Sequence, residues 1–337
     1  MPELRRDPTT GKWVIIATER ALRPTDFKSE EEALKGPENC PFCEGHESMT
    51  PPEITSIRKE GTNPNEPGWF VRVVPNKFPA LKVEGELNRH GKGIYDVMNG
   101  IGAHEVIIES GDHFKSLDTL PLDRVEKVIW MFRERMLDLR KDVRLKYILV
   151  FKNKGRRAGA SLEHPHCQLI ATPVLPDVVK LELDMALRYY QYKERCIYCD
   201  IVEQELNEKE RLIDENEKFI SIVPFASAVP FEIMILPKEH ISDFGQIKAN
   251  EITKLAEILQ NSLKMLEKAV PNVPYNFYIH TSPLDNLNIS YYHFHIHIVP
   301  RLTQLAGFEW GSGFYINPMI PEQAAQFLRN TKEEKQS

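Results

Sequence analysis

This sequence of 337 residues contains no long apolar run. No stretch approaches the roughly 20 apolar residues that a membrane-spanning helix needs, and the charged segment 1–12 has no apolar core of a signal peptide. Basic residues do not predominate either: 43 Lys and Arg against 49 Asp and Glu give a net charge of −6, which argues against coating nucleic acid. We therefore expect a cytoplasmic protein with small-molecule ligands and no membrane or nucleic-acid partner.

Cysteine is scarce, but its positions are informative. Four of the five cysteines form two Cys-x-x-Cys pairs, Cys40 with Cys43 and Cys196 with Cys199, while Cys167 stands alone. This spacing suits ligation of a metal by thiolates better than a secreted disulfide framework. For one isolated pair, a redox function or two unrelated buried thiols would be the alternative.

The order of motifs occurs twice along the chain, which indicates an internal duplication. Each copy runs Cys-x-x-Cys, strand, His, helix, strand, His-x-His. The intervals from His113 to His164 and from His240 to His293 are 51 and 53 positions, so the two copies are nearly in register. The first copy is longer before its first histidine, and segments 50–69 and 83–102 have the composition of surface insertions.

Periodicity predicts the elements between these landmarks. Two apolar faces with helical spacing predict helices: Val125, Val128, Ile129, Phe132, Met136 and Leu139, and then Ile252, Leu255, Leu259, Leu263, Leu266 and Val270. Short β-branched and aromatic segments predict strands at 13–16, 106–108, 147–151, 232–236 and 293–299. We expect an α+β fold of duplicated histidine-triad-like units, residues 1–178 and 179–337, in which antiparallel sheet is crossed by helices.

Each unit supplies the four ligands of a closed zinc site, because a Cys-x-x-Cys turn brings two thiolates to one side of the ion and distant histidines complete the tetrahedron. The sequence therefore predicts two metal sites, with iron as the alternative at the second. The predicted ligands are Cys40, Cys43, His113 and His164 for the first site, and Cys196, Cys199, His240 and His293 for the second.

His166 is the candidate nucleophile. If His164 is tied to a metal, His166 stands beside it on a rigid element, and an imidazole whose other nitrogen donates a hydrogen bond is a good nucleophile toward phosphorus. Gln168, two residues on, would share its face and can donate its amide to phosphate. The preceding loop 155–161 could hold phosphate through backbone N–H groups and the Ser161 hydroxyl.

Two other histidines require interpretation. In the second unit, His295 is the middle histidine of His-x-His-x-His and rivals His166; we favour His166 because the Gly-Ser loop precedes only the first motif. His104 is interpreted as a core or strand histidine, since it aligns with Phe231 and not with His240.

Around His164-Pro-His166-Cys-Gln168, with Gly159-Ala-Ser161 before it, the sequence resembles the galactose-1-phosphate uridylyltransferase family of the histidine-triad superfamily, whose motif is HPHxQ. The resemblance covers nearly the whole chain. It implies a cytoplasmic homodimer that exchanges UMP between UDP-glucose and galactose-1-phosphate by a ping-pong mechanism, through a uridylyl-histidine at His166, with structural zinc.

The resemblance also implies roles for individual residues. It assigns catalysis to His166, Gln168 and Ser161. It assigns binding of the nucleotide to Arg20, Arg23, Asn76, Phe78, Asn153, Gly159, Ser161 and Gln168. It assigns binding of the sugar, across a dimer interface, to Phe308, Glu309 and Tyr315.

Two alternatives stay open. The C-terminal segment 307–317 resembles a branch that includes adenylyl-transferring relatives, such as ADP-glucose phosphorylase or a dinucleoside polyphosphate phosphorylase. From a different class, the chain could be a catalytically silent, zinc-stabilised nucleotide-binding protein, which would bind nucleotide without forming a covalent intermediate.

Overall fold

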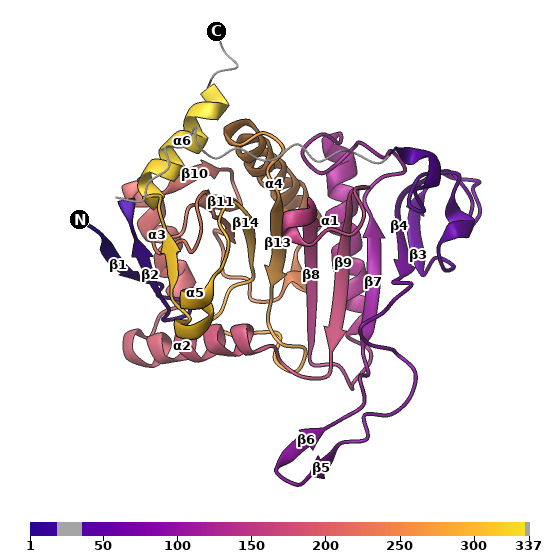
Figure 1. Cartoon of the computed structure of the whole chain (residues 1–337), viewed down its shortest axis with the longest axis horizontal. Helices are drawn as coiled ribbons and strands as arrows, with labels where there is room; N and C mark the ends of the chain where they lie inside the picture. The colour runs from indigo at the N-terminus through magenta and orange to yellow at the C-terminus, as the bar shows by residue number, and fades with distance from the viewer. Residues whose placement is uncertain (19–35, 334–337) are drawn as a thin grey trace.

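An antiparallel sheet of ten strands organises the protein, whose computed structural model describes residues 1–18 and 36–333 (Figure 1). The strand order across the sheet is β10-β11-β12-β14-β13-β8-β9-β7-β4-β3. In chain order, the first five strands of this sheet are β3 (Thr55–Arg58), β4 (Trp69–Pro75), β7 (Ala103–Ile108), β8 (Tyr147–Lys154) and β9 (His166–Thr172). The other five are β10 (Leu212–Glu215), β11 (Phe219–Ile222), β12 (Ile233–Pro237), β13 (Tyr275–His280) and β14 (His295–Pro300).

The strand order shows the duplication directly. Each unit contributes five neighbouring strands in the same order, and β8 and β13 pair at the centre with Asn153 opposite Asn276. The expected α+β fold of duplicated units is therefore confirmed. The proposed boundary between residues 178 and 179 falls in the first turn of α2 (Asp177–Lys193) and stays a prediction.

Two amphipathic helices cover one face of the sheet. These are α1 (Leu122–Leu139) and α4 (Ala249–Ala269), which pack against each other and bury the apolar positions that define their periodicity. Because residues alternate along each strand, Val150, Leu169 and Ile279 enter this core and their neighbours face the opposite side. α6 (Pro321–Glu333) packs beside α4. The two predicted helices are thus confirmed.

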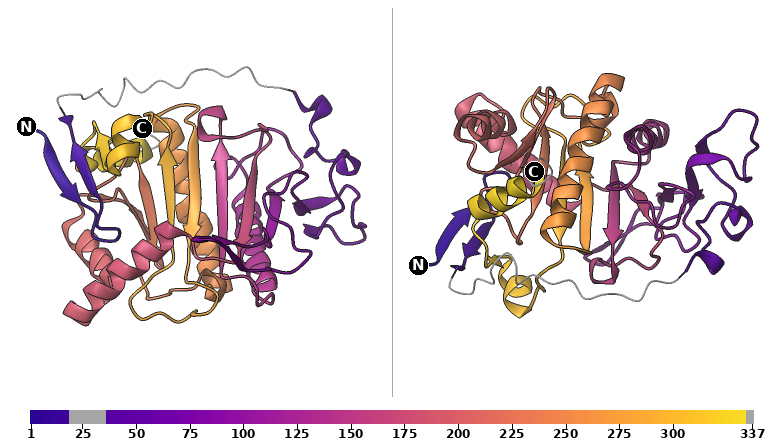
Figure 2. Two further views of the ribbon diagram at one scale, coloured as in Figure 1. Left: turned by 60° about the horizontal axis from the view of Figure 1, so that its bottom comes forward. Right: turned by 90° about the horizontal axis from the view of Figure 1, so that it is seen from above.

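The opposite face carries the remaining elements. Figure 2 shows α2 crossing this face, and α3 (Ile197–Glu208) begins at the second Cys-x-x-Cys. A small sheet joins β1 (Glu3–Arg6), β2 (Trp13–Ile16) and β15 (Tyr315–Asn317), with α5 (Gly307–Ser312) just before β15. In the described ranges, 1–18 and 36–333, no helix combines the length and apolar character needed to cross a membrane.

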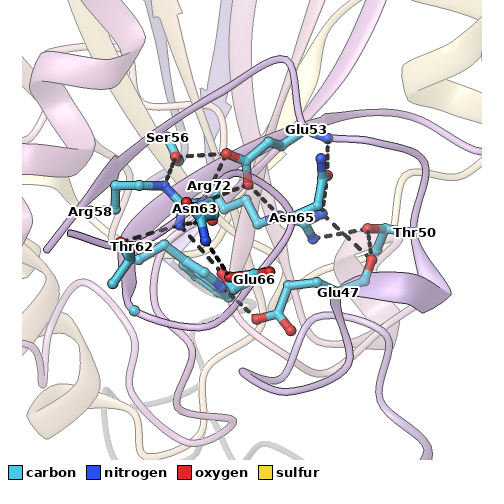
Figure 3. A network of polar contacts seen from close by, with 12 residues as sticks. Glu47, Thr50, Glu53, Ser56, Arg58, Thr62, Asn63, Asn65, Glu66 and Arg72 are labelled. Carbon is cyan, nitrogen blue, oxygen red and sulfur yellow. Dashed lines mark hydrogen bonds and ion pairs between the residues drawn. The ribbon is translucent and has the colours of Figure 1, made fainter. Parts of the chain in front are cut away.

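The two segments expected to be surface insertions differ from each other. Segment 83–102 does form a projecting hairpin, β5 (His90–Lys92) with β6 (Tyr95–Val97) (Figure 1). Segment 50–69 instead contains β3, the counterpart of β10, so the expectation was wrong for that part. Figure 3 shows how it is held: Arg72, 1% exposed, donates to Glu53 and Thr50, and Glu53 also pairs with Arg58.

Both His-x-His segments enter their strands only at the second histidine, so β14 begins two residues after the predicted start at 293. β9 starts at His166, because Pro165 has no N–H to donate to a sheet ladder. β14 starts at His295, because the Phe294 N–H donates to the carbonyl of Ile241 instead. His164 and His293 therefore precede their strands and turn toward the cysteines.

Candidate active site and metal centres

The first predicted ligand set comes together in the structure. Cys40, Cys43, His113 and His164 are buried or nearly so, and their ligand atoms all lie within 4.8 Å of one another. Cys40 Sγ is 3.4 Å from His164 Nδ1, and Cys43 Sγ is 3.4 Å from His113 Nδ1. A tetrahedral zinc with Zn–S of about 2.3 Å and Zn–N of about 2.0 Å places sulfur and nitrogen about 3.5 Å apart. The spacing of these donors fits zinc.

A hydrogen bond from His164 to the backbone orients its ring for metal binding. His164 Nε2–H donates to the carbonyl of Ser110 at 2.8 Å, which leaves Nδ1 with its lone pair toward the cysteines. Burial lowers the pKa of His164 to about 4, so the ring is neutral, as a ligand must be.

The second set has the same arrangement. Cys196, Cys199, His240 and His293 also lie within 4.8 Å of one another. Cys199 Sγ is 3.6 Å from His240 Nδ1 and 3.5 Å from His293 Nε2, and His240 Nε2–H donates to the carbonyl of Ile289. The two ligand sets differ in their histidine nitrogens, because His164 presents Nδ1 to its cysteines and His293 presents Nε2, and the second set is less fully buried.

His166 occupies the first position of β9 and is 6% exposed. Its Nδ1–H donates to the carbonyl of His164 at 2.8 Å, which fixes the tautomer and leaves Nε2 with the lone pair. The ring packs against Phe42 with centroids 5.2 Å apart. Burial, assisted by the nearby Lys152 charge, lowers the pKa of His166, so the imidazole is held in its neutral, nucleophilic form.

A cavity of about 520 Å³ lies over His166. Gln168 and Ser161 line it together with His166, so the three predicted catalytic side chains share one space. Asn76 and Phe78 are in its wall, and the remaining lining is mostly apolar: Pro41, Phe42, Met49, Pro51, Val74, Pro75, Val106 and Leu162. The wall at Met49 to Pro51 adjoins the network of Figure 3, which fixes its position.

The loop before the HPHxQ motif is anchored in the second unit. Gly155 and Gly159 adopt φ of 80° and 88°, left-handed conformations that favour glycine. Asn276 of β13 donates to Asn153 Oδ1 and to the carbonyl of Ala158, both at 2.8 Å. Asn276 therefore links the loop to Asn153, which does not line the His166 cavity.

The rival histidine is covered. His295 Nδ1–H donates to the carbonyl of His293 at 3.1 Å, as His166 does to His164, but its Nε2 lies 3.7 Å from the carboxylate of Glu182 on α2. Tyr198 stacks on the ring at 5.1 Å, and His295 is 1% exposed. α2 and α3 thus occupy in the second unit the space that is open above His166.

Glu182, His280 and His295 form a third candidate metal-ligating group that sequence reasoning missed. Glu182 accepts from His280 Nδ1–H at 2.9 Å and from the Tyr292 hydroxyl at 2.8 Å. His295 lies in the His-x-His-x-His motif already noted, but no sequence pattern indicated that His280 and Glu182 of α2 would lie against it. His104 was also missed as a neighbour of the site: it contacts both Gln168 and Asn76.

The candidate sugar residues do not meet His166 within one chain. Tyr315 lines a separate cavity of about 550 Å³ over β8, β13 and β14. Phe308 is 49% exposed on α5, and Glu309 accepts from the Ala306 N–H at the start of that helix. Arg20 and Arg23 lie outside the described residues.

Comparisons with known proteins agree with this arrangement. Models of the N-terminal and C-terminal domains of galactose-1-phosphate uridyl transferase match residues 1–176 and 182–336. The sequence is 37% identical to ADP-glucose phosphorylase of Arabidopsis thaliana, covering 97% of this chain and 92% of that protein. It is 31% identical to galactose-1-phosphate uridylyltransferase of Thermotoga maritima, covering 99% and 100%.

Solved structures give the same result. The crystal structure of the Arabidopsis ADP-glucose phosphorylase with bound ADP-glucose superposes with a TM-score of 0.83 at 37% identity, covering 98% of both chains. A uridylyltransferase structure superposes with a TM-score of 0.76 at 28% identity, covering 100% of both chains.

Proposed function

The chain belongs to the galactose-1-phosphate uridyl transferase family, and from this premise we propose that it transfers a nucleoside monophosphate through a covalent intermediate on His166. One observation carries the proposal: the Nδ1–H of His166 is held by the His164 carbonyl, while its ring lines a cavity shared with Gln168 and Ser161. The counterpart, His295, has its Nε2 against a carboxylate.

The proposed reaction has two steps. His166 Nε2 attacks the α-phosphorus of a nucleoside diphosphate hexose, a P–N bond forms, and the P–O bond to the hexose-1-phosphate breaks. A second phosphate then attacks the same phosphorus and regenerates the imidazole. Gln168 and Ser161 donate hydrogen bonds to the phosphoryl oxygens, where negative charge develops. A metal held by Cys40, Cys43, His113 and His164 would act structurally, by fixing the segment that leads into His166.

Two donor and acceptor pairs fit this chemistry. The family name supports UDP-glucose with galactose-1-phosphate. ADP-glucose with inorganic phosphate is favoured by the higher identity to the Arabidopsis enzyme than to the Thermotoga one. The cavity of about 520 Å³ has room for either base.

The test uses UDP-glucose and ADP-glucose, each labelled at the α-phosphorus and quenched in alkali to preserve a phosphoramidate. Label on the wild-type protein but not on His166→Gly supports the covalent mechanism, and the donor that labels faster identifies the base. His295→Gly is the matched control and should still be labelled. No label from either donor on folded, metal-loaded protein would refute covalent transfer and support the silent nucleotide-binding alternative.

We further propose that a homodimer completes the site, because Phe308, Glu309 and Tyr315 do not line the His166 cavity of their own chain. The elements that carry them, α5 and β15, lie away from β9 (Figure 1). Mixing His166→Gly with Glu309→Ala subunits should restore activity that neither variant has alone, since the mixed dimer contains one intact composite site. A monomer by light scattering, or no restoration after subunit exchange, would contradict this.

A further inference from the structure

His104 on β7 contacts three groups at the edge of the cavity. The backbone N–H of Ala80 donates to His104 Nδ1 at 3.1 Å. His104 Nε2 lies 2.8 Å from Gln168 Oε1 and 3.1 Å from Asn76 Nδ2. β7 pairs with β9, which places His104 beside the strand that carries His166 and Gln168.

The Ala80 contact determines which nitrogen of His104 carries the proton. A nitrogen that accepts a hydrogen bond presents a lone pair, so in the neutral ring the proton is on Nε2. Nε2–H then donates to Gln168 Oε1. Asn76 Nδ2 is a second donor to that oxygen at 3.4 Å, because Asn76 Oδ1 is already engaged by the N–H of Phe78 at 2.9 Å.

This arrangement determines the orientation of the Gln168 amide. The oxygen and nitrogen of an amide diverge from one carbon, so an oxygen held by His104 and Asn76 turns the NH₂ group away from them. Gln168 follows His166 by two residues on the same strand, and both line the cavity. The flipped amide would point its oxygen at an anionic phosphoryl group and its NH₂ at two donors.

We propose that His104 is a positioning residue that orients Gln168, so that its amide N–H donates to the phosphoryl group attacked by His166. The inference rests on the proposed function and deepens it. His104 itself does not touch the substrate.

A matched pair of variants tests the proposal. The amide nitrogen of glutamine can take the place of His104 Nε2, so His104→Gln keeps the donor to Gln168. The side chain of His104→Asn is shorter: its amide oxygen can replace Nδ1 as the acceptor for the Ala80 N–H, but it offers no donor to Gln168. The measurement is the single-turnover rate of nucleotidyl-protein formation with labelled UDP-glucose and ADP-glucose. We expect His104→Asn to slow it about 10- to 100-fold at unchanged donor affinity, since an oriented donor acts on developing charge, and His104→Gln to stay within about threefold.

A double variant separates positioning from general damage. If His104 acts through Gln168, His104→Asn should cause no further loss in a Gln168→Ala background. His90→Asn, at an exposed histidine of the hairpin, should behave as wild type. Equal losses in both backgrounds, or a wild-type rate for His104→Asn, would overturn the proposal. Absence of label on the wild-type protein would overturn the proposed function, and this outcome is distinct from both.

Discussion

A buried ion pair lies beneath the strand that carries His166. Lys152 of β8 pairs with Glu109, which follows β7, and their side chains are 2% and 0% exposed. Cys167 Sγ donates to the same carboxylate oxygen at 3.1 Å, while Glu109 Oε2 has no partner within the described part of the chain. Burial raises the pKa of Cys167, so this residue remains a thiol.

Replacing Lys152 by methionine should leave the Glu109 side chain without its partner in the core. Breaking a buried pair in this way costs about 3–5 kcal/mol. The double variant Lys152→Met/Glu109→Gln removes both charges and should recover most of that loss, because a buried pair replaced by neutral groups is often close to neutral in stability.

The assay is equilibrium urea unfolding of the metal-loaded protein at pH 7, with thermal unfolding as a second measure. At roughly 2 °C per kcal/mol for a chain of this size, the single variant should melt about 6–10 °C lower. Lys154→Met is the matched control: Lys154 lies two residues further along β8 and pairs with Glu267 at 2.7 Å, but both side chains are 30% exposed. This variant should lose less than about 1 kcal/mol.

Two results would refute the reasoning. If Lys152→Met cost no more than Lys154→Met, burial of the pair would not determine its energetic contribution. If the double variant were as unstable as the single one, the loss would come from packing of the lysine stem and not from an unpaired carboxylate.

Three further predictions concern the polar network, the metals and the second unit. Burial raises the pKa of Glu53, but hydrogen bonds from Asn65, Ser56, Arg72 and Arg58 outweigh it and hold that pKa below its usual value. Its stabilisation is therefore present above the unfolded pKa of about 4.3 and lost as pH falls through the folded pKa. The stability difference between wild type and Glu53→Gln, measured by urea unfolding, should shrink below about pH 4; a constant difference would contradict this. Elemental analysis should show that Cys40→Ser and Cys196→Ser each lose a different bound metal, and equal content in both variants and wild type would exclude these sites. Glu182→Ala removes the partner of a buried histidine and a buried tyrosine and should cost about 3 kcal/mol in urea unfolding; an unchanged midpoint would argue against that network.

Much of the fold could be predicted from local patterns. Helical spacing identified α1 and α4, because a surface helix must turn one apolar stripe to the core. The repeated order of cysteines and histidines predicted two ligand sets that do come together. The start of β9 also has a local cause: Pro165 has no N–H to donate to the sheet, so the strand begins at His166.

The surroundings of each histidine depended on contacts between distant segments. His166 and His295 are each the second histidine of a His-x-His motif and make the same bond to a preceding carbonyl, yet α2 places Glu182 against only one of them. Likewise, the register of β7 against β9 brings His104 to Gln168 across 64 positions of chain. Periodicity along an element indicates which face a side chain takes, but it does not indicate which distant segment packs against that face.

By itself, then, the sequence determined the duplicated units, the two ligand sets and the pair of candidate nucleophiles. Only the tertiary structure decided which candidate nucleophile lies beside an open cavity, that His104 contacts Gln168, and that Phe308, Glu309 and Tyr315 do not line that cavity in the same chain. The physical reason is that a residue's own neighbours set its secondary structure, whereas the packing of helices and strands from distant segments sets what its side chain meets.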